Sequence, residues 1–191
     1  MKNSIKKLGA IAIVAFVGVS FTTNDSKKEI KVEKSKIVWK GHKVTGSHQG
    51  TIDIKSGYLS FNEGKLTDGE FFIDMSTITN TDLEGESKGN LEGHLKSDDF
   101  FGIEKHPTAS LVFKNIKSIN KNTYKVTGDI TIKEITESIT FNLSVHANKA
   151  NASLKIDRTK FGVRFGSSSF FDGLKDKAIY DEFDLIVDLE F

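Results

Sequence analysis

The feature that most constrains this chain is the alternation of apolar and polar residues over most of its length. A period of two puts successive side chains on opposite faces of a strand, so each segment has one apolar and one solvated face. About eight such segments occur, separated by turn-forming residues such as Asn62-Glu63-Gly64. The alternating apolar residues are Ile37, Trp39, Ile52, Ile54, Leu59, Phe61, Phe71, Ile73, Met75, Ala109, Leu111, Phe113, Tyr124, Val126, Ile130, Ile132, Ile139, Phe141, Leu143, Val145, Leu154, Ile156, Phe183, Leu185, Val187, Leu189 and Phe191.

This pattern predicts an all-β, antiparallel fold, because antiparallel sheets combine one buried face with one solvated face. The alternation changes phase near Ser56-Gly57, which predicts a turn or bulge there. Eight strands can close into a barrel or stack as a two-layer sandwich, and the periodicity alone does not decide between them.

Two segments break the alternation. Asn80–Ser97 has few apolar residues, with Leu91 and Leu95 four positions apart, and is predicted to be a short helix in a long connection. Phe161–Lys177 is rich in glycine, serine and phenylalanine. We expect its rings, Phe165, Phe170 and Phe171, to be buried, for example at the mouth of a barrel.

The N-terminus has the pattern of a secretory signal peptide, predicted over residues 1–23. Lys2 to Lys7 form a basic stretch, Leu8 to Val19 form an apolar run, and small or polar residues follow. An uncleaved anchor is the alternative interpretation. Polar residues 24–35 are predicted to be a flexible leader, and residues 36–191 the folded domain. We therefore expect an exported protein, periplasmic or extracellular. The sequence contains no cysteine, which excludes disulfides and a cysteine-linked lipid anchor.

Composition favours an apolar interior and argues against nucleic acid as a partner. Phenylalanine occurs 15 times, against one tryptophan and three tyrosines, and its ring has no polar group. The 27 basic side chains nearly balance the 26 acidic ones, and three of the lysines fall in the predicted signal peptide. No basic arm or stripe remains in the rest of the chain.

The residues offer little to an enzyme. The five histidines show no metal-ligand spacing, no serine lies in Gly-x-Ser-x-Gly, and no glycine-rich segment has the pattern of a phosphate-binding loop. Acidic residues such as Asp184, Asp188 and Glu190 alternate with apolar ones, as solvating charges do. We therefore expect no catalysis, no metal and no cofactor.

Three basic side chains share the parity of the apolar face near strand ends: Lys43, His48 and Arg158. A buried charge needs a partner, a water path or a position at the rim. One interpretation is structural, with ion pairs or side chains that reach solvent. The other is a cationic collar for a ligand headgroup, in which Arg158 would bind a phosphate.

Several motifs make the chain similar to the YceI-like family of polyisoprenoid- or lipid-binding barrels. They lie in the same order from about Lys36 to Phe191: Gly46-Ser-His48-Gln-Gly50-Thr51, Asp74-Met75, His94 to Phe101, His106-Pro107-Thr-Ala109, Gly128 to Lys133, Arg158-Thr-Lys-Phe161-Gly162, and Phe170-Phe171-Asp172 leading to Asp181-Glu182-Phe183. One departure is Glu134, where the family usually has glycine after Thr-Ile-Lys. Glutamate would be strained at positive φ, so we expect a different turn geometry there.

The resemblance implies an eight-stranded, lipocalin-like antiparallel barrel that holds an isoprenoid lipid, such as a polyprenyl phosphate or a quinone. We therefore predict non-catalytic lipid binding, as a carrier or sequestering protein. The alternative is a filled barrel that acts through its loops by protein interaction. The sequence leaves open whether the protein is a monomer or a homodimer. The predicted ligand-binding residues are Trp39, Ile52, Phe71, Phe113, Phe141, Leu154 and Phe161, with Lys43, His48 and Arg158 near the headgroup.

Overall fold

A computed structural model describes residues 25–191, which form nine strands, one α-helix and three short 3-10 turns. The strands are β1 (Asp25–Glu29), β2 (Lys36–Lys43), β3 (Gly46–Asn62), β4 (Lys65–Asn80), β5 (Thr108–Ser118), β6 (Thr123–Ile132), β7 (Ile135–His146), β8 (Lys149–Asp157) and β9 (Ile179–Glu190). The helix is α1 (Gly85–Lys96), and the turns are η1 (Val32–Lys34), η2 (Arg158–Phe161) and η3 (Lys175–Lys177).

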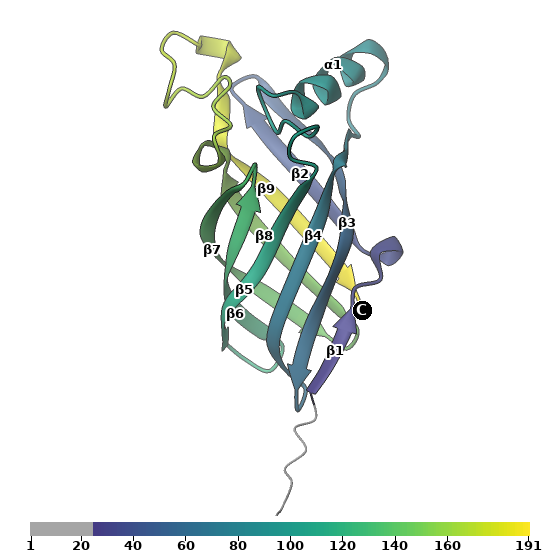
Figure 1. The fold of residues 1–191 in the computed structure, drawn as a ribbon. Helices are drawn as coiled ribbons and strands as arrows, with labels where there is room; N and C mark the ends of the chain where they lie inside the picture. The colour runs from purple at the N-terminus through teal and green to yellow at the C-terminus, as the bar shows by residue number, and fades with distance from the viewer. Residues whose placement is uncertain (1–24) are drawn as a thin grey trace, which may run out of the picture.

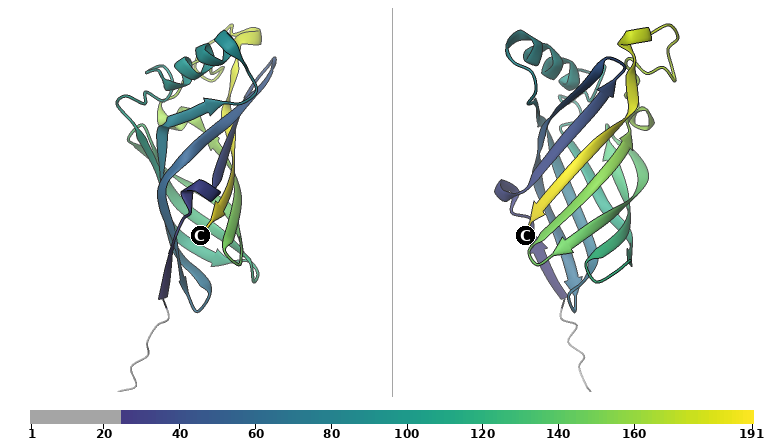
Figure 2. Two further views of the ribbon diagram at one scale, coloured as in Figure 1. Left: turned by 90° about the vertical axis from the view of Figure 1, so that its right-hand side faces the viewer. Right: turned by 180° about the vertical axis from the view of Figure 1, so that it is seen from behind.

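Strands β2 to β9 close into an eight-stranded antiparallel barrel (Figure 1). The hydrogen-bonded order is β2-β9-β8-β7-β6-β5-β4-β3, and pairing of β2 with β3 completes the circle. Views from one side and from behind show the same tilted strands (Figure 2). The structure therefore shows a barrel and not a sandwich. The interior of an eight-stranded barrel is just wide enough to be filled by side chains or to hold one small ligand.

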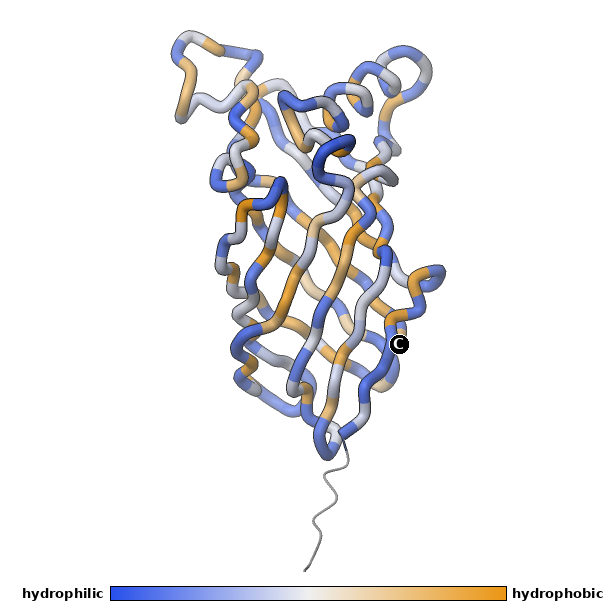
Figure 3. The backbone as a smooth tube through the Cα atoms, viewed as in Figure 1, coloured by the Kyte–Doolittle hydropathy of each residue, from blue (hydrophilic) through white to orange (hydrophobic). Residues whose placement is uncertain are grey.

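The predicted alternation is confirmed along the barrel wall. Ile52 and Ile54 face inward on β3, and the register with β4 then shifts between Ile54 and Ser56. Beyond that bulge the odd-numbered residues Leu59 and Phe61 face inward. Figure 3 shows the resulting alternation of hydrophobic and hydrophilic positions along the strands. The extra residue lets one long strand keep its apolar side chains inside as the sheet curves.

The barrel is filled at the end that carries the β3–β4 hairpin. Leu59 and Val126 are fully buried there, and the rings of Phe61 and Phe191 lie 5.6 Å apart. The Tyr124 hydroxyl accepts a hydrogen bond of 3.3 Å from the backbone N–H of Leu66. Side-chain packing therefore closes this end, and any ligand space lies toward the other.

Helix α1 lies at the opposite end of the barrel, in the connection between β4 and β5 (Figure 1). The predicted short helix is confirmed within Asn80–Ser97. Leu95 is buried and Leu91 packs on the core, so the two leucines anchor an otherwise polar helix. Within residues 25–191, no helix combines the length and the apolar character needed to cross a membrane.

The prediction of a flexible leader over residues 24–35 is wrong for the part that the structure describes. Asp25–Glu29 forms β1, which pairs with the end of β3, and Val32–Lys34 forms η1. The lysines explain why such a polar segment is fixed: the Lys27 ammonium lies 3.8 Å from the centre of the Tyr58 ring, and Lys28 lies over Phe61 and Phe191. The predicted signal peptide, residues 1–23, lies outside the described residues.

The expected change of turn geometry at Glu134 is also wrong. Lys133 and Glu134 connect β6 and β7 with φ angles of 51° and 64°, although neither is glycine. A two-residue hairpin favours positive φ at both positions because this twist matches that of the strands. The strain at Lys133 is offset by two hydrogen bonds. Its ammonium donates to the carbonyls of Asp98 and Phe100, at 3.2 and 2.7 Å.

Glycine at position 134 should therefore stabilise the protein. Glu134→Gly relieves the left-handed strain but makes the unfolded chain more flexible, so we expect a net gain of about 0.5–1 kcal/mol in the free energy of unfolding. Urea denaturation measures it. The control is Glu137→Gly inside β7, which should lower stability by a similar amount. A loss of stability in Glu134→Gly would contradict strain at this turn.

Candidate functional site

The hollow half of the barrel contains a cavity of about 330 Å³ with an overwhelmingly apolar wall. The predicted lining residues Trp39, Ile52, Phe71, Phe113, Phe141 and Leu154 all contribute to it. Lys43, His48 and Arg158 also border it. The size falls within the usual range of small-molecule sites, roughly 300–1,000 Å³.

Phe161 is the predicted residue that does not line the cavity. It is 2% exposed but lies in η2, after strand β8 has ended at Asp157. The Asp157 carboxylate accepts a hydrogen bond of 3.0 Å from the N–H of Thr159 and caps the new turn. The strand alternation stops there, so parity no longer predicts where the Phe161 ring points.

Three phenylalanines, from β4, β5 and β7, form part of the wall. The ring of Phe113 lies 5.7 Å from that of Phe71 and 5.9 Å from that of Phe141, both in tilted or edge-to-face geometry. Gly69 makes room for them, because a Cβ atom there would lie 2.7 Å from the Phe113 ring. Rings without polar atoms give this wall no hydrogen-bonding demand.

Trp39 adds a large ring whose polar atom is already satisfied. Its indole Nε1 donates a hydrogen bond of 3.1 Å to the backbone carbonyl of Thr79 on β4. The ring lies against Gly50, where a Cβ atom would come within 2.6 Å of Cζ2. The glycine of the Gly46–Thr51 motif thus has a structural reason: it admits the indole and brings β3 close to β4.

The cavity ends among residues of α1 and of the segment that follows it. Leu91, His94 and Leu95 border it from the helix, and Phe100 and Phe101 border it from the turn beyond. These five residues were not predicted from the sequence as cavity-lining residues. The motif His94–Phe101 marked this segment in the sequence. It lies outside the strands, so strand alternation could not predict which of its side chains face the cavity.

Two histidines at this end are paired with carboxylates. His42 Nε2 lies 2.8 Å from Asp184 Oδ2, and His48 Nδ1 lies 3.2 Å from Asp82 Oδ2. The hydrogen bond from His42 is the main reason that the pKa of Asp184 is lowered. Burial opposes ionisation of Asp82, but hydrogen bonds from Asn80 and His48 outweigh it and lower that pKa as well. These pairs leave His42 and His48 already engaged.

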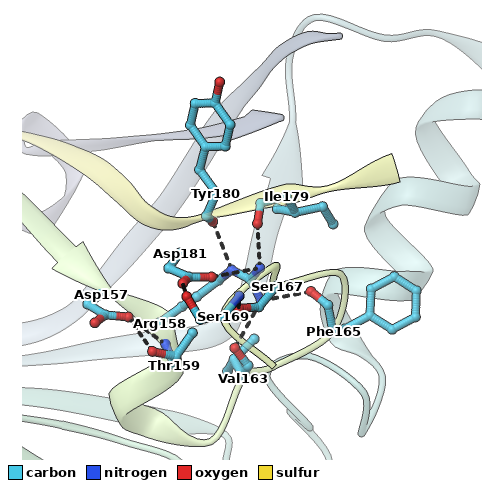
Figure 4. Close-up of polar contacts among 10 residues, drawn as sticks. All are labelled: Asp157, Arg158, Thr159, Val163, Phe165, Ser167, Ser169, Ile179, Tyr180 and Asp181. Carbon is cyan, nitrogen blue, oxygen red and sulfur yellow. Dashed lines mark hydrogen bonds and ion pairs between the residues drawn. The ribbon is translucent and has the colours of Figure 1, made fainter. Parts of the chain in front are cut away.

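Arg158 is 2% exposed and its guanidinium is held almost entirely by the backbone (Figure 4). Nε donates to the carbonyl of Tyr180 at 3.0 Å, and Nη2 to that of Ile179 at 3.0 Å. Nη1 donates to the carbonyls of Val163 and Phe165, both at 2.9 Å. Four of its five N–H groups are thereby used.

The remaining charge contact of Arg158 is with Asp181, whose Oδ1 lies 3.7 Å from Nη2. Burial lowers the pKa of the guanidinium, and the charges of Asp181 and Asp157 act against that shift. Of the two roles left open by the sequence, this geometry favours the structural one. A headgroup could bind Arg158 only by displacing the carbonyls that hold it.

The expected burial of the aromatic loop is wrong. Phe165, Phe170 and Phe171 remain 46%, 46% and 51% exposed. The loop is closed by its own hydrogen bonds, from the N–H groups of Phe170 and Phe171 to the carbonyl of Ser167. None of these three rings lines the cavity, although the Phe165 ring packs against His94 at its end.

The described residues contain no group of three or more histidine, cysteine, aspartate or glutamate side chains arranged to hold a metal ion. The cavity walls supply hydrocarbon surface and a few polar groups at one end. Such a site can surround an elongated apolar molecule and contact one polar end of it.

Known proteins share this architecture. The BcnA protein of Burkholderia cenocepacia superposes with a TM-score of 0.66 over 84% of this chain and 98% of its own, at 21% identity. A polyisoprenoid-binding domain from Saccharophagus degradans, described as implicated in plant cell wall breakdown, gives a TM-score of 0.57 over 84% of this chain and 95% of its own, at 12% identity. At these identities the likeness concerns the fold.

Sequence comparison gives the family. The UPF0312 protein of Pseudomonas putida (strain KT2440) is 25% identical over 125 residues, which are 60% of this chain and 63% of that protein. The chain thus spans less than two thirds of that relative's length. The model of the YceI-like domain matches residues 28–191, from the strand β1 to the last residue. The chain belongs to the YceI-like family.

Proposed function

We propose that this protein binds an elongated apolar lipid of the isoprenoid class inside the barrel, without converting it chemically, as a carrier or sequestering protein. The observation that carries the proposal is the cavity of about 330 Å³ walled by aromatic and aliphatic side chains. Burial of hydrocarbon surface in such a space gives about 25 cal/mol per Å² of favourable free energy, which suits a ligand that is apolar along its length.

The isoprenoid class is supported by two independent points. A solved domain of the same fold, from Saccharophagus degradans, is described as polyisoprenoid-binding. The lining residues also extend along the barrel, from Leu143 and Leu189 in its interior to His94 and Tyr180 at the open end. A slender chain with one polar end fits that arrangement.

Export is part of the proposal. The basic and apolar pattern of residues 1–23 supports a cleaved signal peptide, and a barrel with a hydrocarbon interior would let the protein hold a lipid in the periplasm or outside the cell. N-terminal sequencing of the exported protein should give a first residue between Ser20 and Ser26. Retention of Met1 would instead favour an anchor.

The filled-scaffold alternative has one observation in its favour, the exposed rings of Phe165, Phe170 and Phe171. Against it stands the cavity, since a pure scaffold would gain stability by filling that space. A direct experiment separates the two functions.

Ala152→Phe should reduce lipid binding at least tenfold while the barrel stays folded. Ala152 borders the cavity from β8, so a benzyl group there occupies space that the ligand needs. Native mass spectrometry of gently purified protein, and titration of delipidated protein with a polyprenyl quinone, measure binding. The matched control is Asn151→Phe, which adds the same ring to the exposed face of the same strand. Equal binding by both variants would contradict a ligand in the barrel.

A further inference from the structure

Buried polar atoms without a partner are rare in folded proteins, and each requires an explanation. Among the described residues, three side chains carry one: His94 Nε2, His106 Nδ1 and Asp181 Oδ1. Two of them lie within 4 Å of a charged side chain. His106 Nδ1 lies 3.8 Å from Glu134 Oε1, and Asp181 Oδ1 lies 3.7 Å from Arg158 Nη2.

His94 Nε2 has no such neighbour, and His94 is the one of the three that borders the cavity. Its ring is fixed between two phenylalanines, edge to face, at 5.4 Å from Phe100 and 4.3 Å from Phe165. Phe100 lies in the turn that follows α1. The other comes from the loop after η2, whose backbone Arg158 holds through the Phe165 carbonyl. Packing thus orients the imidazole.

Three other basic groups at the cavity end are occupied, whereas Lys43 borders the cavity without a side-chain partner among the described residues. His42 and His48 are paired with Asp184 and Asp82, and Arg158 donates to four carbonyls. An unpaired buried nitrogen destabilises a protein when no partner arrives, so it is expected where a ligand provides the partner.

We propose that His94 is the residue that recognises the polar end of the ligand, through a hydrogen bond between Nε2 and an uncharged oxygen such as a quinone carbonyl or an alcohol. This inference rests on the proposed function, because it assumes that a lipid occupies the barrel. An imidazole nitrogen can donate to a carbonyl or accept from a hydroxyl, so both heads share the same chemistry.

An uncharged head is favoured over a phosphate by the surroundings. The imidazole lies between the rings of Phe100 and Phe165, which offer a charged head no hydrogen bond to replace its hydration. The guanidinium that could neutralise a phosphate is held by the backbone. Lys43, which also borders the cavity, is the cation that a phosphate head would need.

The test compares ligands with and without a head in delipidated protein. The variants are His94→Phe, which keeps an aromatic ring between Phe100 and Phe165, and His94→Gln, which keeps a hydrogen-bonding group. The ligands are a polyprenyl quinone, a polyprenol and squalene, which has no polar group. Quenching of the single tryptophan, Trp39 in the cavity wall, reports quinone binding, and native mass spectrometry reports the other two.

We expect His94→Phe to weaken quinone and polyprenol binding about 5- to 10-fold and to leave squalene binding unchanged, with partial recovery in His94→Gln. We also expect a higher melting temperature for ligand-free His94→Phe, because the unpaired nitrogen is gone. Equal loss for all three ligands, or no loss for any, would overturn the role of His94.

Two further outcomes are separable. If polyprenyl phosphate binds more tightly than the quinone and depends on Lys43 (Lys43→Met) but not on His94, the head is anionic and this inference fails while lipid binding stands. If the wild-type protein binds none of the lipids, squalene included, the proposed function itself fails.

Discussion

Replacing Arg158 with alanine is expected to lower the free energy of unfolding by about 3–5 kcal/mol, the range for removing one partner from a buried, charged network. The guanidinium joins the loop after η2, through the carbonyls of Val163 and Phe165, to the start of β9, through those of Ile179 and Tyr180. Alanine leaves these buried or half-buried carbonyls and Asp181 without this donor. Chemical denaturation measures the loss.

Arg158→Lys should recover little of the stability, because one ammonium cannot reach four carbonyls arranged around a planar fork. Arg164 provides the matched control from the same loop. Its guanidinium is exposed and lies 4.5 Å from the centre of the Phe170 ring, so Arg164→Ala should change stability by about 0.5 kcal/mol or less.

The same variant tests the cationic collar. If Arg158 is structural, the ratio of affinities for a polyprenyl phosphate and a quinone should be the same in wild type and in whatever fraction of Arg158→Ala remains folded. A selective loss of phosphate binding with unchanged stability would restore the collar, and would show that the carbonyl contacts can open for a ligand.

The sequence predicted most of the cavity wall because strand alternation is a local property. Trp39, Phe71 and Phe141 point inward for the same reason, a period of two that continues until the strand ends. The prediction failed at Phe161, where the strand had already given way to a turn capped by Asp157. Parity carries information only as far as the extended backbone does.

The roles of polar residues could not be predicted in the same way. The alternation placed Arg158 on the inner face, and it does border the cavity. Its partners are backbone carbonyls of residues between 163 and 180, and every residue type has such a carbonyl, so the sequence cannot identify them. His94 lies on a mainly polar helix, and its contacts with Phe100 and Phe165 depend on how a turn and a distant loop meet it. Long-range geometry determines both cases.

Glu134 shows a local rule overridden by its context. Positive φ disfavours glutamate, which argued for a different turn. The pairing of Ile132 with Ile135 leaves only two residues for the connection. A two-residue hairpin turn needs positive φ at both, so Lys133 and Glu134 adopt it despite the backbone strain. The hydrogen bonds from Lys133 to the carbonyls of Asp98 and Phe100 help to hold it, and they also tie this hairpin to the turn that borders the cavity.

The second large effect is expected at Gly50. A Cβ atom there would lie 1.7 Å from the carbonyl oxygen of Thr79 and within 2.7 Å of the Trp39 ring. The overlap with a backbone atom cannot be relieved by rotating a side chain, so β3 must move away from β4. Gly50→Ala should therefore lower the free energy of unfolding by roughly 3 kcal/mol or more, at or above the upper end for overpacking.

Trp39 reports the same event from inside the barrel. Separation of β3 from β4 should weaken the hydrogen bond from its Nε1 to Thr79 and admit water to the indole, which shifts the emission to longer wavelength. Gly41→Ala is the control, because a Cβ atom at that cavity-lining glycine meets nothing within 4 Å. It should change neither stability nor emission by much. If Gly50→Ala proved as stable as Gly41→Ala, with unchanged emission, the close approach of β3, β4 and the indole would be wrong.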